Sequence, residues 1–174
     1  MSEQRQSTRR LFFACWPQEH IRQAIVGRRT LIDGLSSRRV PDHNLHLTLL
    51  FLGNQPAERL PDLLAATDDL GSPAFDLCLD RLGWFPGARV VWLGGSTPEA
   101  AQALVQRLTH LAHGLALRFD QRRFHPHVTL YRSVAARPAL PSPPPLIWPV
   151  REFALIESIP SRPYQVLRTW PLTL

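Results

Sequence analysis

One short pattern occurs twice in the chain and constrains its fold more than any other feature. His46-Leu47-Thr48-Leu49 and His127-Val128-Thr129-Leu130 both read His-apolar-Thr-apolar. Side chains alternate between the two faces of a strand, so the histidine and threonine of each copy share one face while the apolar residues point into the core. A single copy is typical of any half-buried strand with a polar outer face. Two copies, each after a long amphipathic helix, indicate two related halves.

The segments around the two motifs alternate between strand and helix patterns. The order strand, helix, strand, helix, strand, strand, helix, strand, strand, strand predicts an α/β or α+β fold with helices on one side of largely antiparallel sheets. The expected strands are residues 10–16, 45–52, 75–80, 89–93, 127–131, 152–158 and 165–172, and the expected helices are 17–33, 57–70 and 98–115.

Glycine and proline punctuate this pattern at several points. Gly53-Asn54 is expected to close the first motif strand as a turn, and Pro61 to interrupt or restart the second helix. Pro17 suits the first turn of the first helix, and Ser96-Thr97-Pro98-Glu99 offers a cap, a first-turn proline and an early acid for the third. The proline-rich residues 138–149 are expected to cross the surface as irregular chain.

The paired motifs suit one kind of chemistry. If the two halves are related by a pseudo-two-fold axis, the motif strands face each other, with His46 and His127 on opposite sides of a bound group. Hydrolysis of a cyclic phosphodiester needs one group that takes a proton from water and another that gives a proton to the leaving oxygen, and histidine can do either near neutral pH. The hydroxyls of Thr48 and Thr129 can donate to the non-bridging phosphate oxygens.

Composition narrows the partners and the compartment. The net charge is +6 and the chain contains no lysine, so its positive charges are arginines, which bind phosphate through two parallel hydrogen bonds. Cys15 and Cys78 each stand alone in an apolar stretch, which indicates buried free thiols in a reducing compartment. The apolar patch at residues 11–16 is too short for a signal peptide core, and no apolar run is long enough to span a membrane. We therefore expect a cytoplasmic, monomeric protein with no membrane partner.

The flanks of the motifs resemble a known superfamily. Residues 44–53 (NLHLTLLFLG) and 124–130 (FHPHVTL) are similar to the paired His-x-Thr/Ser-x motifs that define the two-histidine (2H) phosphoesterases. The opening strand at residues 10–14, the hairpin at residues 83–94 and the closing strand at residues 164–172 resemble those of the bacterial and archaeal RNA 2′,3′-cyclic phosphodiesterases, also called 2′-5′ RNA ligases. The similarity runs nearly end to end.

The resemblance implies a fold and a reaction. It implies a single bilobal α+β domain over residues 1–174, in which two lobes related by a pseudo-two-fold axis carry antiparallel sheets that line a central basic cleft, with helices outside. It implies hydrolysis of the 2′,3′-cyclic phosphate at an RNA end to a 2′-phosphate, without metal or cofactor. His46 would donate a proton to the leaving 3′ oxygen and His127 would accept one from water. The reverse reaction, with a 5′-hydroxyl in place of water, would join RNA through a 2′-5′ bond. Tyr131 departs from the family pattern, since many members have a small residue there.

Several arginines and aromatic residues near the motifs are further candidates for binding. Arg132, at the end of the second motif strand, can either reach the phosphate or remain solvated. Arg122 and Arg123 can steer an RNA backbone, although a solvated loop explains them somewhat better. Phe51 and Phe124 can stack on a base, although a core position explains Phe51 better.

Three other residues, His43, His125 and Trp170, are expected to have no role in catalysis. His125 and His127 have a metal-like spacing, but no convincing third ligand lies nearby in the sequence, so we expect no zinc site. His43 is expected to be a loop residue and Trp170 a core residue.

Two rival interpretations stay open. The chain can be an RNA- or nucleotide-binding module that keeps the fold without activity, although the intact histidines and threonines argue against this. It can also be a cyclic phosphodiesterase that acts on a small nucleotide, which would need a closed pocket in place of an open groove.

Overall fold

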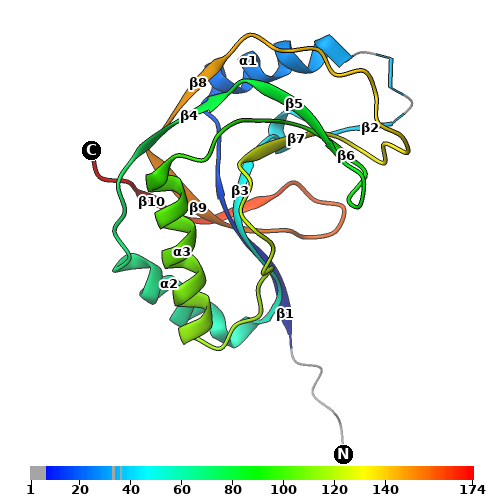
Figure 1. Cartoon of the computed structure of the whole chain (residues 1–174). Coiled ribbons are helices and arrows are strands. Elements are labelled where there is room, and N and C mark those ends of the chain that lie inside the picture. Colours follow the sequence, from blue (N-terminus) through cyan, green and yellow to red (C-terminus); the bar gives the residue numbers. More distant parts are fainter. Residues whose placement is uncertain (1–6, 33, 36) are drawn as a thin grey trace, which may run out of the picture.

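A long antiparallel sheet organises the computed structural model, which describes residues 7–32, 34, 35 and 37–174 (Figure 1). The strand order is β10-β9-β1-β3-β7-β6-β5, with β2 beside β7. Its strands are β1 (Thr8–Cys15), β2 (Arg38–Arg39), β3 (Leu47–Pro56), β5 (Arg81–Phe85), β6 (Val90–Gly94), β7 (His127–Arg132), β9 (Glu152–Glu157) and β10 (Gln165–Pro171). A second, two-stranded sheet pairs β4 (Phe75–Leu79) with β8 (Leu146–Val150).

The two motif strands join the halves of the large sheet. β3 is the last strand of the half that contains β10, β9 and β1, and β7 is the first strand of the half that contains β6 and β5. The halves meet at one pair of directly opposite residues, Leu47 and Val128. This arrangement confirms the expected α+β fold with antiparallel sheets and positions the two motifs side by side.

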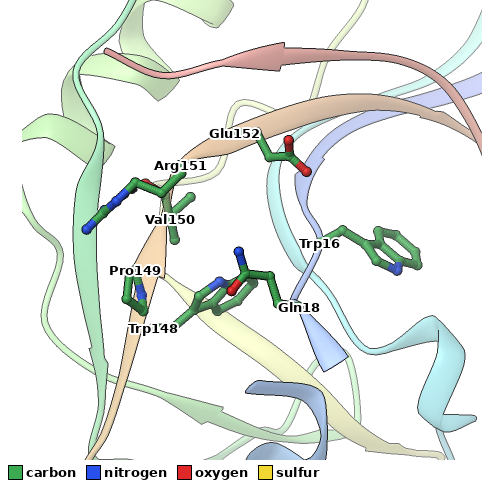
Figure 2. Close-up of a pocket in the computed structure, with 7 residues that line it drawn as sticks. All are labelled: Trp16, Gln18, Trp148, Pro149, Val150, Arg151 and Glu152. Atoms are coloured by element: carbon green, nitrogen blue, oxygen red, sulfur yellow. Dashed lines mark hydrogen bonds between the residues drawn. The ribbon is translucent and has the colours of Figure 1, made fainter. Parts of the chain in front are cut away.

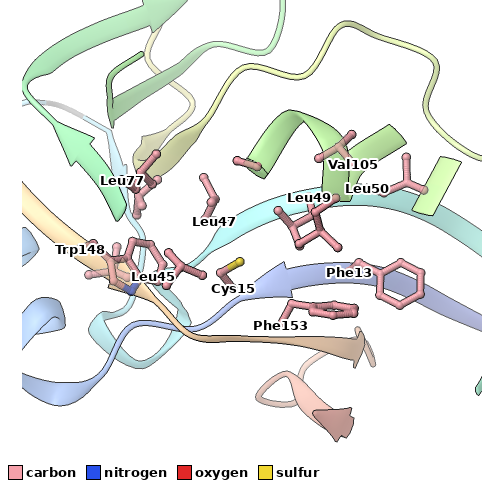
Figure 3. Close-up of a cluster of buried hydrophobic side chains, with 14 of the residues drawn as sticks. Phe13, Cys15, Leu45, Leu47, Leu49, Leu50, Leu77, Val105, Trp148 and Phe153 are labelled. Carbon is pink, nitrogen blue, oxygen red and sulfur yellow. The ribbon is translucent and has the colours of Figure 1, made fainter. Parts of the chain in front are cut away.

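One face of the large sheet is covered by the helices. These are α1 (Glu19–Arg29), α2 (Leu60–Asp68) and α3 (Glu99–Gly114). Each contributes buried apolar residues to the main core, together with the inner faces of β1, β3 and β7 and both strands of the small sheet. Figure 3 shows part of this core, in which Leu47 and Leu49 of β3 lie near Cys15 of β1. No helix in the described ranges is long and apolar enough to cross a membrane.

The first motif strand does not end at Gly53-Asn54, so the predicted turn is wrong. β3 runs to Pro56 because β1 extends to Thr8 and continues the ladder of pairs. Gly53 has a φ of +69°, a conformation that glycine adopts without strain, beside an extra residue of β3 at Leu52. The glycine marks a bulge within the strand.

The proline-rich segment also ends differently from the prediction. Its last residues form β8, which pairs with β4 and buries the Trp148 side chain to 2% exposure. Pro149 is tolerated because β8 belongs to a two-stranded sheet, where one side of each strand needs no hydrogen-bond donor.

Proline precedes two of the helices instead of standing in their first turn. α1 begins at Glu19, two residues after Pro17, and its predicted end at Asp33 lies outside the described residues. Pro98 is the residue before α3, and no side-chain hydrogen bond caps that helix, so the predicted cap is wrong. The restart at Pro61 is confirmed, since this proline lies at the beginning of α2 after a short 3-10 turn.

Candidate active site

The contact between β3 and β7 brings the two motifs onto one surface. Leu47 and Val128 are directly opposite each other and fully buried in the core. In antiparallel strands, the residues on either side of such a pair also face one another across the strands, and they point to the other face of the sheet. Those residues are His46, Thr48, His127 and Thr129, all partly buried. We call the sheet face that carries these four residues the site face.

Both histidine rings are oriented by the same local hydrogen bond. His46 Nδ1 lies 2.7 Å from the carbonyl oxygen of Asn44, and His127 Nδ1 lies 2.6 Å from that of His125. A carbonyl oxygen can only accept, so Nδ1 carries the proton in each ring and Nε2 is left to exchange protons with a ligand. Thr48 Oγ1 lies 3.0 Å from His46 Nε2 and donates to it when the ring is neutral.

Aromatic side chains enclose His46. Trp16 stacks on the imidazole with ring centroids 5.2 Å apart and an angle of 4° between the planes. Tyr164 meets the ring edge-on at 5.5 Å, and Phe12 lies 5.1 Å away. Phe12 lies within β1, Trp16 directly follows that strand, and Tyr164 comes from the connection between β9 and β10. Sequence reasoning missed all three as parts of the site.

A second aromatic group encloses His127. Phe85 meets this imidazole edge-on at 5.2 Å, and Trp92 lies 6.2 Å away. Trp92 can lie against β5 only because the residue opposite it is Gly83, where an added Cβ would lie 2.0 Å from the indole ring. The glycine and tryptophan of this hairpin were visible in the sequence, but only as part of a family resemblance.

A β-bulge turns Arg132 toward the histidines. β7 has one more residue than β6 at Leu130, and both Leu130 and Tyr131 are buried. The alternation of side chains therefore shifts by one, and Arg132 lies on the same face as His127 and Thr129. Without the bulge it would point to the core face. The large Tyr131 side chain is accommodated in the core and does not narrow the site.

Burial and positive charge lower the pKa of both imidazoles. The pKa of His46 falls from 6.5 to about 4; desolvation is the largest cause, and the charges of Arg132 and His127 contribute. The pKa of His127 is also lowered, first by desolvation and then by neighbouring charges that include Arg132. Both rings are therefore mainly neutral near neutral pH in the unligated protein.

The other sequence candidates divide between the site and the rest of the fold. Phe51 is half-buried on the site face, where it packs against the smaller core cluster, 6.5 Å from Phe12 and beneath the guanidinium of Arg10. Phe124 packs against the main core instead. Arg122 forms an ion pair with Asp120, a contact that was not predicted.

Four further predictions concerned residues outside the site. Trp170 is buried in the core and His43 is exposed on a short 3-10 turn, as predicted. Cys15 and Cys78 are free thiols; Cys15 is buried and Cys78 is partly buried. Arg123 is exposed in a loop. Within the part of the chain that the structure describes, no three His, Cys, Asp or Glu side chains are grouped to hold a metal ion.

A small cavity of about 110 Å³ lies beside the site and contains none of the four motif residues. It is lined by Trp16, Gln18 and residues 148–152 (Figure 2). Trp16 thus borders this cavity as well as stacking on His46.

Comparison with known proteins gives consistent matches. Residues 17–159 match the family model described as the 2′-5′ RNA ligase superfamily. An RNA 2′,3′-cyclic phosphodiesterase of Escherichia coli is 37% identical over 174 residues, covering 94% of this chain and 97% of that protein. One of Thermus thermophilus is 37% identical over 163 residues, covering 86% of this chain and 81% of that protein.

Solved structures match over almost the whole chain. The crystal structure of E. coli LigT complexed with 3′-AMP has a TM-score of 0.88 and 34% identity, covering 97% of this chain and all of that one. The structure of TT0787 of Thermus thermophilus has a TM-score of 0.81 and 35% identity, covering 94% of this chain and 97% of that one.

Proposed function

The chain belongs to the 2′-5′ RNA ligase superfamily, and on that premise we propose that it hydrolyses the 2′,3′-cyclic phosphate at RNA 3′ ends to a 2′-phosphate. The observation that carries the proposal is the position of His46 and His127 on one sheet face, each with Nδ1 bound to a backbone carbonyl, so that Nε2 is the nitrogen that can exchange protons. The names of the curated relatives and the nucleotide complex of LigT support the same reaction.

Two imidazoles with opposite protonation can perform the reaction without further groups. Neutral His127 accepts a proton from the attacking water at Nε2, and protonated His46 donates one from Nε2 to the departing 3′ oxygen. In the unligated protein the pKa of His46 is lowered to about 4. The negative charge of a bound phosphate favours the protonated form of the ring and so raises this pKa.

Protonation of His46 also changes what Thr48 can do. In the unligated protein the Thr48 hydroxyl donates to His46 Nε2. Once Nε2 carries a proton it no longer accepts, so the hydroxyl is free to donate to a phosphate oxygen. Thr129 can donate from the other motif, and Arg132 supplies positive charge on the same face. Protonation of His46 therefore has two effects: the ring becomes able to act as the acid, and the Thr48 hydroxyl becomes able to bind the substrate.

The test uses chelator-treated protein and an oligoribonucleotide that ends in a 2′,3′-cyclic phosphate. We expect the 2′-phosphate as product and no loss of rate with EDTA. His46→Ala and His127→Ala should each lower turnover by at least about a hundredfold, the usual contribution of one general acid or base. His43→Ala, which removes an exposed histidine just before the motif, is the matched control and should change little.

Two outcomes would contradict the proposal. Near-normal hydrolysis by both histidine variants would show that the two imidazoles are not a catalytic pair. Binding of RNA ends without hydrolysis of any cyclic phosphate would favour a binding module with the same fold.

A further inference from the structure

The short edge strand β2 places a second arginine beside Arg132. Arg38 is directly opposite Arg132 in the antiparallel pairing of β2 with β7. Directly opposite residues point to the same face, with Cβ atoms roughly 5 Å apart. Because Arg132 lies on the site face, Arg38 lies there too. The next residue, Arg39, pairs with the buried Tyr131 and points to the other face.

The charges of these two arginines are uncompensated by their surroundings. Arg38 is exposed and Arg132 is partly buried. No ion pair or side-chain hydrogen bond joins either one to any other residue in the described ranges. Like charges directly opposite across two strands destabilise a sheet, so negatively charged groups of a ligand bound at these arginines would relieve a repulsion that the fold maintains.

The position of Arg38 indicates which anion it would meet. Arg132 is close enough to lower the pKa of both His46 and His127, which places it beside the reacting phosphate. β2 pairs with β7 on the side away from β6, beyond the end of the contact between β3 and β7, so Arg38 lies along the strands from His46 and level with Arg132. The charge of Arg132 lowers the pKa of both histidines, whereas that of Arg38 is not a cause for either one, so Arg38 is better placed for a neighbouring phosphate of the same ligand.

We propose, building on the function proposed above, that Arg38 binds the phosphodiester that joins the last two nucleotides of the RNA. An oligoribonucleotide has this phosphate and a 2′,3′-cyclic mononucleotide does not. The residue would therefore favour RNA ends over small cyclic nucleotides, and it would do so through charge and without reading the base.

The test compares a 2′,3′-cyclic mononucleotide with a dinucleotide that ends in a 2′,3′-cyclic phosphate. Arg38→Gln should lower kcat/KM about tenfold more on the dinucleotide than on the mononucleotide, in line with one charge-assisted hydrogen bond. The slope of log(kcat/KM) against log(salt) on the dinucleotide should become shallower by about 0.7, the value for one phosphate contact with a single strand. Arg39→Gln, which removes the neighbouring exposed arginine from the other face, should not discriminate between the substrates.

An uncharged linkage makes the assignment specific. Replacing the upstream phosphodiester by a methylphosphonate should cost the wild type about as much as Arg38→Gln does. The two changes should not add, because they remove the same contact. Additive losses would assign Arg38 to another group of the ligand and overturn the proposal.

Other results would also overturn it. Equal losses on the two substrates would mean that Arg38 acts on the reacting phosphate or on the fold, and equal effects of Arg39→Gln would mean that only net charge matters. Binding of dinucleotides ending in a 2′-phosphate, with and without the methylphosphonate, tests the same contact without turnover. Failure of the proposed function, seen as no hydrolysis by the wild type, is thereby distinguishable from failure of the Arg38 contact.

Discussion

Protonation of His46 should cost the unligated protein part of its stability as the pH falls below neutrality. The ring is enclosed by Phe12, Trp16 and Tyr164, and Arg132 adds positive charge nearby. These surroundings exclude the water that would solvate an imidazolium, and they lower the pKa of His46 from 6.5 to about 4.

The sign and size of the effect follow from linkage. The unfolded chain binds the proton at the ordinary pKa and the folded chain only at the lowered one, so the stabilisation is complete above about 6.5 and is lost progressively as the pH falls from there to about 4. At about 1.4 kcal/mol per pH unit, the whole contribution is about 3 kcal/mol. About 2 kcal/mol of this should be lost by about pH 5.

Urea unfolding followed by tryptophan fluorescence measures this loss. The carboxyl pKa values of Asp68 and Asp120 are also lowered, so acid destabilises the protein through them in every variant. The informative quantity is therefore the difference between the wild type and His46→Gln, whose stabilities should converge by about 2 kcal/mol between about pH 7 and about pH 5. His43→Gln, which replaces an exposed histidine, should follow the wild type.

A parallel loss of stability in the wild type and His46→Gln would refute this reasoning. It would mean that water reaches the imidazole despite the three aromatic rings. The pKa of His46 would then lie near its ordinary value. The inference that protonation of His46 releases the Thr48 hydroxyl would no longer be supported.

Three further outcomes follow from the same contacts. Arg132→Met should raise the pKa of both His46 and His127, because its charge lowers both, and NMR titration of the ring protons would measure this; unchanged values would contradict the position of Arg132. Sulfate, a stand-in for phosphate, should bind with proton uptake near neutral pH, since a bound anion raises the pKa of both His46 and His127. Calorimetry in two buffers of different ionisation enthalpy would detect this uptake, and proton release would argue against the site. Asp42→Ala should lower the free energy of unfolding by about 2 kcal/mol, because the buried Arg29 loses a charged partner 2.5 Å away and keeps only the carbonyl oxygen of Val40; an effect below about 0.5 kcal/mol would contradict this.

The motifs and most of the elements could be predicted because they depend on local periodicity. The apolar stripe of α3 is buried at Ala101, Leu104, Val105, Leu108 and Ala112, as its spacing predicts. The histidine and threonine of each motif share a face because they are two residues apart in extended chain. Such relations need no knowledge of which strand is the neighbour.

The aromatic surroundings of His46 could not be predicted, because they depend on strand order. Trp16 and Tyr164 are distant in the sequence and meet only because β9 lies beside β1 in the sheet. Nothing in the local pattern of either segment determines that neighbour. The family resemblance included the segment around Tyr164, but it implied no role for that segment at the site.

The bulges explain why plain alternation failed just beyond each motif. β3 has an extra residue at Leu49 relative to β1, and β7 has one at Leu130 relative to β6, each at the last position of its motif. Alternation without a bulge would turn the fifth residue after each histidine to the core, whereas the bulge turns it to the site face. Those residues are Phe51 and Arg132. Both halves therefore contain the same β-bulge, which turns an aromatic ring of β3 and a guanidinium of β7 to the site face. The backbone geometry of the internal repeat therefore continues beyond the motif, although the residue types there differ between the halves. A comparison of residue types alone could not reveal this shared geometry.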